Sequence, residues 1–111
     1  MMAGKRIAWL LVSGVCHAQN IRLIQPQPDG SLVLWGNGNR RPAQDGFVYR
    51  LRVSSRGELL ETHAWWSEGT PMLLGGQAVV WHGWQQGRQT LLPPEALDEI
   101  NVGFSVMEAL P

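Results

Sequence analysis

FVYRLRVSSRGELLETHAWW, residues 47–66, carries the clearest structural pattern in this chain of 111 residues. Within it, apolar side chains occupy alternate positions from Phe47 to Val53, and a period of two is typical of a β-strand with one apolar face. Ser55-Arg56-Gly57 has the composition of a turn, and residues 58–66 continue as a second extended segment. The segment therefore predicts an antiparallel β-hairpin.

One register of this hairpin satisfies both of its faces. If the turn is centred on Arg56-Gly57, the apolar face pairs Val53 with Leu60, Leu51 with Thr62, Tyr49 with Ala64 and Phe47 with Trp66. The opposite face then pairs Arg52 with Glu61, Arg50 with His63 and Val48 with Trp65. Because a slip of one residue would exchange the two faces, we expect this register, with an apolar inner face and a charge-paired outer face.

The rest of the chain predicts further short strands separated by glycine and proline. The expected strands are residues 21–25, 31–36, 77–85, 90–92 and 101–106, with turns or loops at 27–30, 37–46 and 67–76. Pro94-Glu95 opens a short helix expected over residues 95–100. These elements predict an all-β, mainly antiparallel fold, a small sandwich or barrel of about six strands with one short C-terminal helix.

The first 18 residues have the three parts of a secretory signal peptide. Lys5 and Arg6 form a positive lead, residues 7–15 are apolar, and Ala18 is a small residue before a candidate cleavage point. The apolar run is too short for a stable membrane span, which needs about 20 residues. We therefore expect residues 1–18 to be a signal peptide, residues 19–111 to form a single small β-rich domain, and the location to be periplasmic or extracellular. The alternative is that this segment is retained as a strand.

Cleavage after Ala18 would change the chemistry of the chain. Removing 18 of 111 residues would leave 93, without the only cysteine, Cys16, and the only lysine, Lys5. The nine basic residues would fall to seven against nine acidic ones, a net charge of −2. Such a domain has no thiol chemistry, and its charge gives no reason to expect nucleic acid as a partner.

Catalytic and metal-binding patterns are weak. Glu61 and His63 share one face of a strand, and His82 would join them if residues 77–85 paired with residues 58–66. Carboxylate and imidazole ligands suit zinc, so these three residues are a candidate metal site, and an exposed Glu–Arg pair with aromatic-flanked histidines is the competing interpretation. The chain has no nucleophile elbow and no phosphate-binding loop. We therefore predict no catalytic residue, no enzymatic activity and no cofactor.

Tryptophan is the most unusual component, with six in the chain. Adjacent Trp65 and Trp66 must point to opposite faces of their strand. If Trp66 joins the core, Trp65 is left on the outer face. One interpretation is an exposed platform that binds a protein or a glycan through Trp65, Trp84, His82, Arg50 and His63. The other is a sandwich that buries most of the indoles, with Trp65 stacked on Arg50.

Two functional hypotheses follow. The first is a non-enzymatic exported module that docks to a protein or another cell-envelope component through aromatic and arginine side chains, with self-association or carbohydrate binding as variants. The second is a small structural subunit of a large assembly, such as a virion or a secretion machine, in which residues 1–15 are retained as an ordered strand or arm.

Overall fold

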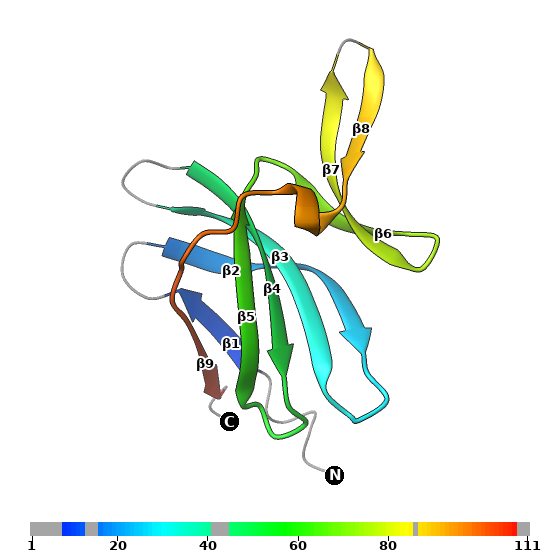
Figure 1. The fold of residues 1–111 in the computed structure, drawn as a ribbon. Coiled ribbons are helices and arrows are strands. Elements are labelled where there is room, and N and C mark those ends of the chain that lie inside the picture. The colour runs from blue at the N-terminus through cyan, green and yellow to red at the C-terminus, as the bar shows by residue number, and fades with distance from the viewer. Residues whose placement is uncertain (1–7, 13–15, 41–44, 86, 109–111) are drawn as a thin grey trace.

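The computed structural model describes residues 8–12, 16–40, 45–85 and 87–108, and these residues form an all-β antiparallel fold (Figure 1). The strands are β1 (Ala8–Val12), β2 (Cys16–Pro26), β3 (Leu32–Arg40), β4 (Asp45–Val53), β5 (Leu59–Trp66), β6 (Thr70–Leu74), β7 (Gln77–Gln85), β8 (Arg88–Leu92) and β9 (Phe104–Glu108). The single helical element among them is a 3-10 turn, η2 (Pro94–Ala96). The predicted fold class is confirmed.

The strands form three antiparallel sheets. A four-stranded sheet has the order β2-β3-β4-β5, a three-stranded sheet has the order β6-β7-β8, and β1 pairs with β9. In Figure 1 the β1–β9 ribbon lies along one side of the four-stranded sheet, and the β7–β8 hairpin extends away from the rest of the chain. Strands that follow one another along the chain are therefore neighbours throughout the four-stranded sheet.

The register predicted for residues 47–66 is confirmed at six of its seven pairs, from Phe47 opposite Trp66 to Arg52 opposite Glu61. The seventh differs, because Val53 faces Leu59 across an irregularity. The loop of the hairpin has three residues, 55–57, rather than the two residues Arg56 and Gly57 that the expected register implies. The Ser54 amide donates to the Glu58 carbonyl at 2.8 Å, and Gly57 has a φ of 88°. A glycine in this conformation closes a three-residue hairpin loop with a bulge.

The structure has nine described strands rather than about six, and β2 and β8 begin earlier than expected, at Cys16 and Arg88. Four other differences have a clear physical reason. The expected turn region 67–76 contains β6, because Gly75-Gly76 with positive φ angles makes a tight hairpin and pairs Met72 with Val79. The expected loop 37–46 is shortened because β3 and β4 continue their ladder to Arg40 and Asp45. The expected helix 95–100 is reduced to η2, since residues 98–100 hydrogen-bond to β5 instead. The last strand begins at Phe104 rather than at residue 101.

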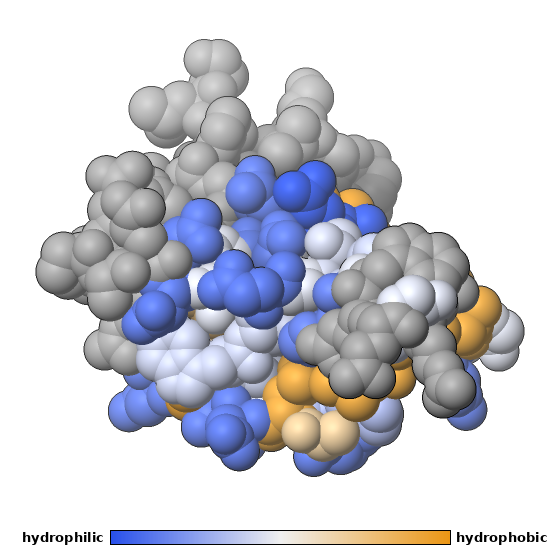
Figure 2. All heavy atoms as spheres, turned by 90° about the horizontal axis from the view of Figure 1, so that it is seen from above, coloured by the Kyte–Doolittle hydropathy of each residue, from blue (hydrophilic) through white to orange (hydrophobic). Residues whose placement is uncertain are grey.

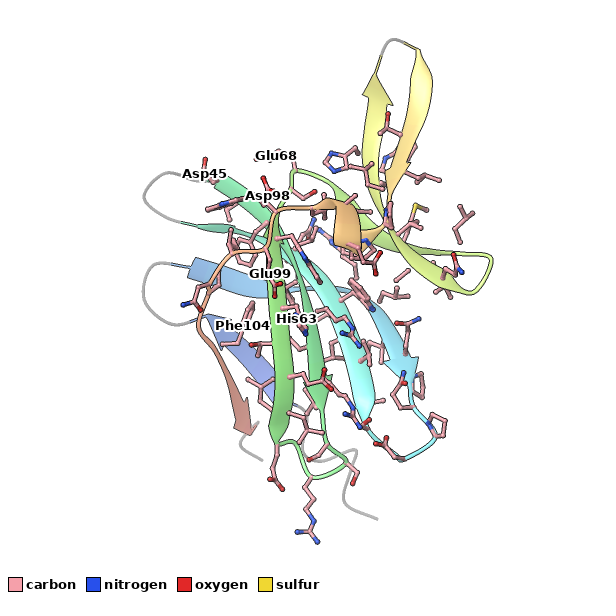
Figure 3. All side chains as sticks on the ribbon, viewed as in Figure 1. Asp45, His63, Glu68, Asp98, Glu99 and Phe104 are labelled. Atoms are coloured by element: carbon pink, nitrogen blue, oxygen red, sulfur yellow. The ribbon has the colours of Figure 1, made fainter. Side chains whose placement is uncertain are left out.

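The four-stranded sheet is buried on both faces. On the inner face, buried side chains form one cluster, comprising Leu34, Phe47, Tyr49, Leu51, Val53 and Ala64. The C-terminal segment covers this cluster, with the Phe104 ring 5.3 Å from the Tyr49 ring between centroids (Figure 3). On the outer face a second cluster comprises Val33, Trp35, Val48, Trp65 and Val80, packed against Ala78 and Leu97. The expected charge-paired outer face is thus confined to the end of the hairpin near the turn.

The segment expected to be a signal peptide includes strand residues in this structure. Residues 8–12 form β1 and pair with residues 104–108 of β9, while Cys16 and His17 begin β2. Lys5 and Arg6 lie outside the described residues. Cleavage after Ala18 would remove β1 and the start of β2, and would leave β9 without its pairing partner.

Candidate binding groove

Cross-strand register brings the polar and aromatic residues of the outer face into adjacent rows. Trp35 lies opposite Arg50, and Arg50 lies opposite His63, so one row crosses β3, β4 and β5. Val48 and Trp65 form the next row on the same face, because residues two apart on a strand share a face. The hairpin pattern that sets the β4–β5 register therefore also sets the position of this row.

The rings in these rows are stacked. The Trp35 and Trp65 ring centroids are 6.1 Å apart with an interplanar angle of 14°, and those of His63 and Trp65 are 5.9 Å apart at 12°. The Arg50 guanidinium carbon lies 5.8 Å from the Trp35 ring centroid, within range of a cation–π interaction. The Trp35 Nε1–H donates to Gln25 Oε1 at 2.8 Å. These contacts join the side chains of β3, β4 and β5 to one another and to Gln25 of β2. The members are Trp35, Arg50, His63, Trp65 and Gln25.

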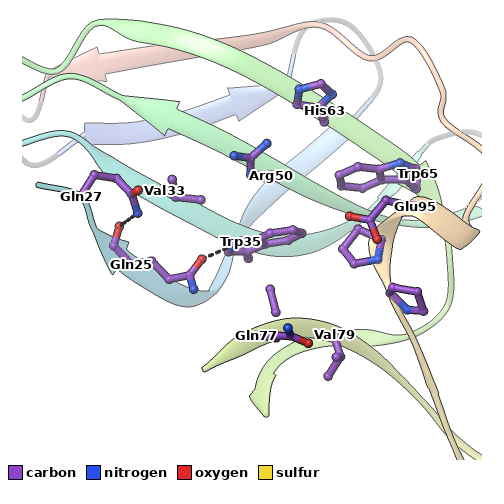
Figure 4. Close-up of a pocket in the computed structure, with 13 residues that line it drawn as sticks. Gln25, Gln27, Val33, Trp35, Arg50, His63, Trp65, Gln77, Val79 and Glu95 are labelled. Atoms are coloured by element: carbon purple, nitrogen blue, oxygen red, sulfur yellow. Dashed lines mark hydrogen bonds between the residues drawn. The ribbon is translucent and has the colours of Figure 1, made fainter. Parts of the chain in front are cut away.

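This stack lines an open groove of about 660 Å³ between the four-stranded sheet and the β6–β7 and η2 segments (Figure 4). Its polar lining consists of Gln25, Gln27, Arg50, His63, Gln77 and Glu95. A second hollow of about 400 Å³ adjoins it, since Gln27, Val33 and Arg50 line both. We call these two adjoining hollows the tryptophan groove; Arg50 lines both of them.

The two arginines of β4 on this face differ in their partners. Arg52 donates through Nη1 to Glu61 Oε2 at 2.9 Å, and through Nη2 to Asp29 Oδ2. Hydrogen bonds from Ser31, and then from Arg52, lower the pKa of Asp29 to about 2. Among the described residues, no carboxylate or other hydrogen-bond acceptor pairs with the guanidinium of Arg50. Arg50 therefore faces the groove without an ion-pair partner among the described residues, although Glu61 lies close enough for the two charges to interact.

His63 connects the groove to the C-terminal segment. Its Nδ1 lies 2.9 Å from Glu99 Oε1 (Figure 3). The same segment is joined to β5 by two backbone hydrogen bonds, from Trp66 N to Asp98 O at 3.1 Å and from Ile100 N to Ala64 O at 2.8 Å. His63 is thus held at the groove by a stacked indole on one side and a carboxylate from a distant part of the sequence on the other.

The candidate metal set of Glu61, His63 and His82 is wrong. Strand β7 pairs with β6 and β8 rather than with β5, so His82 is not brought beside the other two residues. Each side chain instead has its own partner: Glu61 bonds to Arg52, His63 to Glu99 and His82 to Ser67. Within the described residues no cluster of three or more His, Cys, Asp and Glu side chains is arranged to hold a metal ion.

The predicted exposed platform of Trp65, Trp84 and His82 is wrong at Trp65, which is only 8% exposed. Strand β7 and Leu97 cover it from a second layer. His82 is half-buried, with its Nε2 3.2 Å from Ser67 Oγ. The side chain of Trp84 lies outside the described part of the structure. The competing interpretation, that most of the indoles are buried with Trp65 stacked on Arg50, holds for the burial of Trp35 and Trp65. Arg50 lies over Trp35 rather than over Trp65.

Three of the five predicted binding residues, Arg50, His63 and Trp65, line the groove. Sequence reasoning missed Trp35, the glutamines and Glu99. Trp35 could be predicted from the sequence, because pairing β3 with β4 over their full length places Trp35 beside Arg50. The positions of Gln77, Glu95 and Glu99 could not be predicted, since these residues reach this face through contacts between segments far apart in sequence.

In the parts of the chain that the structure describes, no helix combines the length and apolar character needed to cross a bilayer. Comparison with known protein families, with curated proteins and with solved structures found no match to this chain.

Proposed function

We propose that this chain is a non-enzymatic binding module, exported to the periplasm or the cell exterior, that docks to a protein or another cell-envelope component through the tryptophan groove. The observation that carries the proposal is the guanidinium of Arg50, which has no ion-pair partner among the described residues and lies over Trp35 inside an open depression of about 660 Å³. Ligand sites are typically concave, with an apolar lining and a few placed polar groups. The groove is concave and combines apolar side chains such as Val33 and Val79 with polar side chains such as Arg50.

A concave site takes the place of the exposed aromatic platform that the sequence predicts. Trp35 and Trp65 are 6% and 8% exposed, so neither indole can insert into a pocket on a partner. Instead they support Arg50 and His63 from below, and these two side chains and the glutamines remain in contact with the groove. A narrow segment of a partner would therefore enter the groove, rather than a flat face stacking against it.

The Ser67–His82 pair gives little support to a catalytic alternative. Ser67 is buried, and its Oγ accepts a hydrogen bond from the Gly69 amide at 2.9 Å, an arrangement that serine commonly uses to stabilise a turn. A serine nucleophile needs access to substrate and a base oriented by a third group. Among the described residues, no carboxylate is hydrogen-bonded to His82.

The test fills the groove with bulk. Ala78 is half-buried and lines the groove, so Ala78→Trp should occlude it, whereas Leu60→Trp adds the same indole at an exposed position of β5 that does not line it. The full chain and both variants are screened against immobilised oligosaccharides and against a displayed peptide library. We expect ligands that bind the parent and Leu60→Trp but not Ala78→Trp. No ligand in either set, or ligands that still bind Ala78→Trp, would overturn the proposal.

The second candidate, a structural subunit, has its own supporting observation. In Figure 2, apolar side chains in orange gather toward the lower and right-hand margin, while hydrophilic side chains in blue cover the middle. Three exposed apolar residues, Met72, Leu73 and Leu74, lie on β6, which is an edge strand. Exposed apolar edges favour association through β-pairing. Sizing at micromolar concentration discriminates: a stable monomer argues against the subunit, and a dissociation produced by Leu73→Lys argues for it.

A further inference from the structure

We propose that the ligand of the tryptophan groove is an oligosaccharide that carries carboxylate groups, a uronic acid polymer, and that Arg50 binds one of its carboxylates. This inference rests on the proposed function, because it names the class of ligand for the same groove. Arg50, Gln25, Gln27 and Gln77 carry the recognition.

Arg50 is the residue that selects for an anion. A guanidinium offers five N–H donors in a fixed fork that matches a carboxylate, and no acceptor among the described residues occupies the fork of Arg50. The neighbouring Arg52 is already neutralised by Asp29 and Glu61. The cation–π contact with Trp35, 5.8 Å from the guanidinium carbon to the ring centroid, restrains the Arg50 side chain, so less conformational entropy is lost when a carboxylate binds.

The remaining polar lining suits hydroxyl groups. Gln25, Gln27 and Gln77 line the same groove. Gln25 Oε1 accepts from Trp35 and Gln27 Nε2 donates to the Gln25 carbonyl, so Gln25 keeps its donor end for a ligand and Gln27 keeps its acceptor end. A sugar hydroxyl likewise donates and accepts. Gln77 is exposed at the β6–β7 turn, and Glu95, also exposed, adds a carboxylate that can accept from a hydroxyl.

The position of the groove favours a sugar chain over a peptide. Peptides commonly gain affinity by adding a strand to a free sheet edge. The groove lies instead over the face of β3, β4 and β5, and the backbones of β3 and β4 are paired on both sides. The two adjoining hollows share Gln27, Val33 and Arg50 and give room for more than one residue of a linear polymer. Asp29 and Glu61, which line the second hollow, are ion-paired with Arg52, so we expect the carboxylate of a bound sugar beside Arg50.

The experiment is calorimetric titration of the full chain with three acidic hexamers, of galacturonic, mannuronic and glucuronic acid, and with their methyl esters. Esterification removes the charge and keeps the sugar ring, so it tests recognition of the carboxylate without altering the protein. We expect at least one acidic hexamer to bind and its ester to bind at least about 10-fold more weakly, because hydrogen bonds to charged groups have about this effect.

Protein variants give the second arm. Arg50→Gln should weaken binding of that hexamer by about 10- to 100-fold, whereas Arg56→Gln, which removes the same charge from the exposed β4–β5 turn, should leave it unchanged. Arg50→Lys should be intermediate, because lysine keeps the charge and loses the fork. Circular dichroism establishes that each variant is folded.

The outcomes separate this inference from the proposed function. Ester and acid bound equally, or tight binding retained by Arg50→Gln, would overturn the carboxylate assignment and keep a sugar-binding groove. If the acidic hexamers do not bind and an acidic peptide does, with loss in Ala78→Trp, the ligand class is wrong and the proposed function stands. If nothing in the hexamer or peptide sets depends on the groove, both are wrong.

Discussion

Trp35 and Trp65 stack at 14° with their ring centroids 6.1 Å apart, although they belong to β3 and β5, which are not neighbours in the sheet. Strand β4 lies between them and contributes Val48 opposite Trp65. The indoles therefore lie over β4 and form the base of the groove. The same contact stabilises the fold and positions the groups that we propose to bind ligand.

Replacing Trp65 with alanine should destabilise the protein strongly. The substitution empties the centre of the outer cluster and removes the ring on which both Trp35 and His63 stack. We expect the free energy of unfolding in urea to fall by about 3–5 kcal/mol, as for other buried tryptophans. Leu60→Ala, at an exposed position of the same strand, is the control and should change it by less than about 0.5 kcal/mol. A small effect at Trp65 would contradict the burial described here.

Two glycine-to-alanine substitutions should differ in their cost because they act through different mechanisms. A Cβ at Gly36 would overlap the Tyr49 phenol and the Asn20 carbonyl, so Gly36→Ala should cost about 3 kcal/mol or fail to fold. At Gly57, φ is +88° and no atom lies within 4 Å of an added Cβ, so Gly57→Ala should cost about 1–2 kcal/mol. Thermal or urea unfolding of both variants measures the two losses of stability. A larger loss for Gly57→Ala than for Gly36→Ala would contradict the packing of β3 on Tyr49.

Asp29 should contribute an acid-sensitive part of the stability. Its pKa is lowered from 3.8 to about 2, chiefly by hydrogen bonds from Ser31 and then by Arg52. Because the folded-state pKa lies below the unfolded value, this stabilisation is present above pH 3.8 and is lost as the pH falls through 3.8 toward 2. Urea midpoints measured from neutral pH down to pH 2 should fall less steeply for Asp29→Asn than for the parent. Equal slopes would show that the Asp29 contacts do not persist in solution.

The N-terminus of the native protein tests the expected export. We predict that protein purified from its native source begins at Gln19, because residues 1–18 have the composition of a signal peptide. Intact mass and N-terminal sequencing measure this directly. A chain that begins at Met1 would instead favour the structural-subunit hypothesis, in which β1 remains paired with β9.

Local patterns were sufficient for the central hairpin and for the class of the fold. The alternation from Phe47 to Val53 and the turn before Glu58 predicted six cross-strand pairs correctly, since a period of two admits one register once a face is buried. They were insufficient for β6, where the Gly75-Gly76 turn was recognised as a turn but its apolar neighbours were not recognised as a strand.

The cross-strand pairs of the candidate site were predictable from the sequence, and the segments that pack over them were not. Arg50 opposite His63 follows from the hairpin register alone. The burial of Trp65, the Glu99 partner of His63 and the separation of His82 from Glu61 do not. Each depends on where β7 and the C-terminal segment pack, and those positions result from contacts between residues far apart in sequence, on which local periodicity carries no information. Alternation within the chain thus determined which side chains share the outer face, while long-range packing determined which of them are covered and which line an open groove.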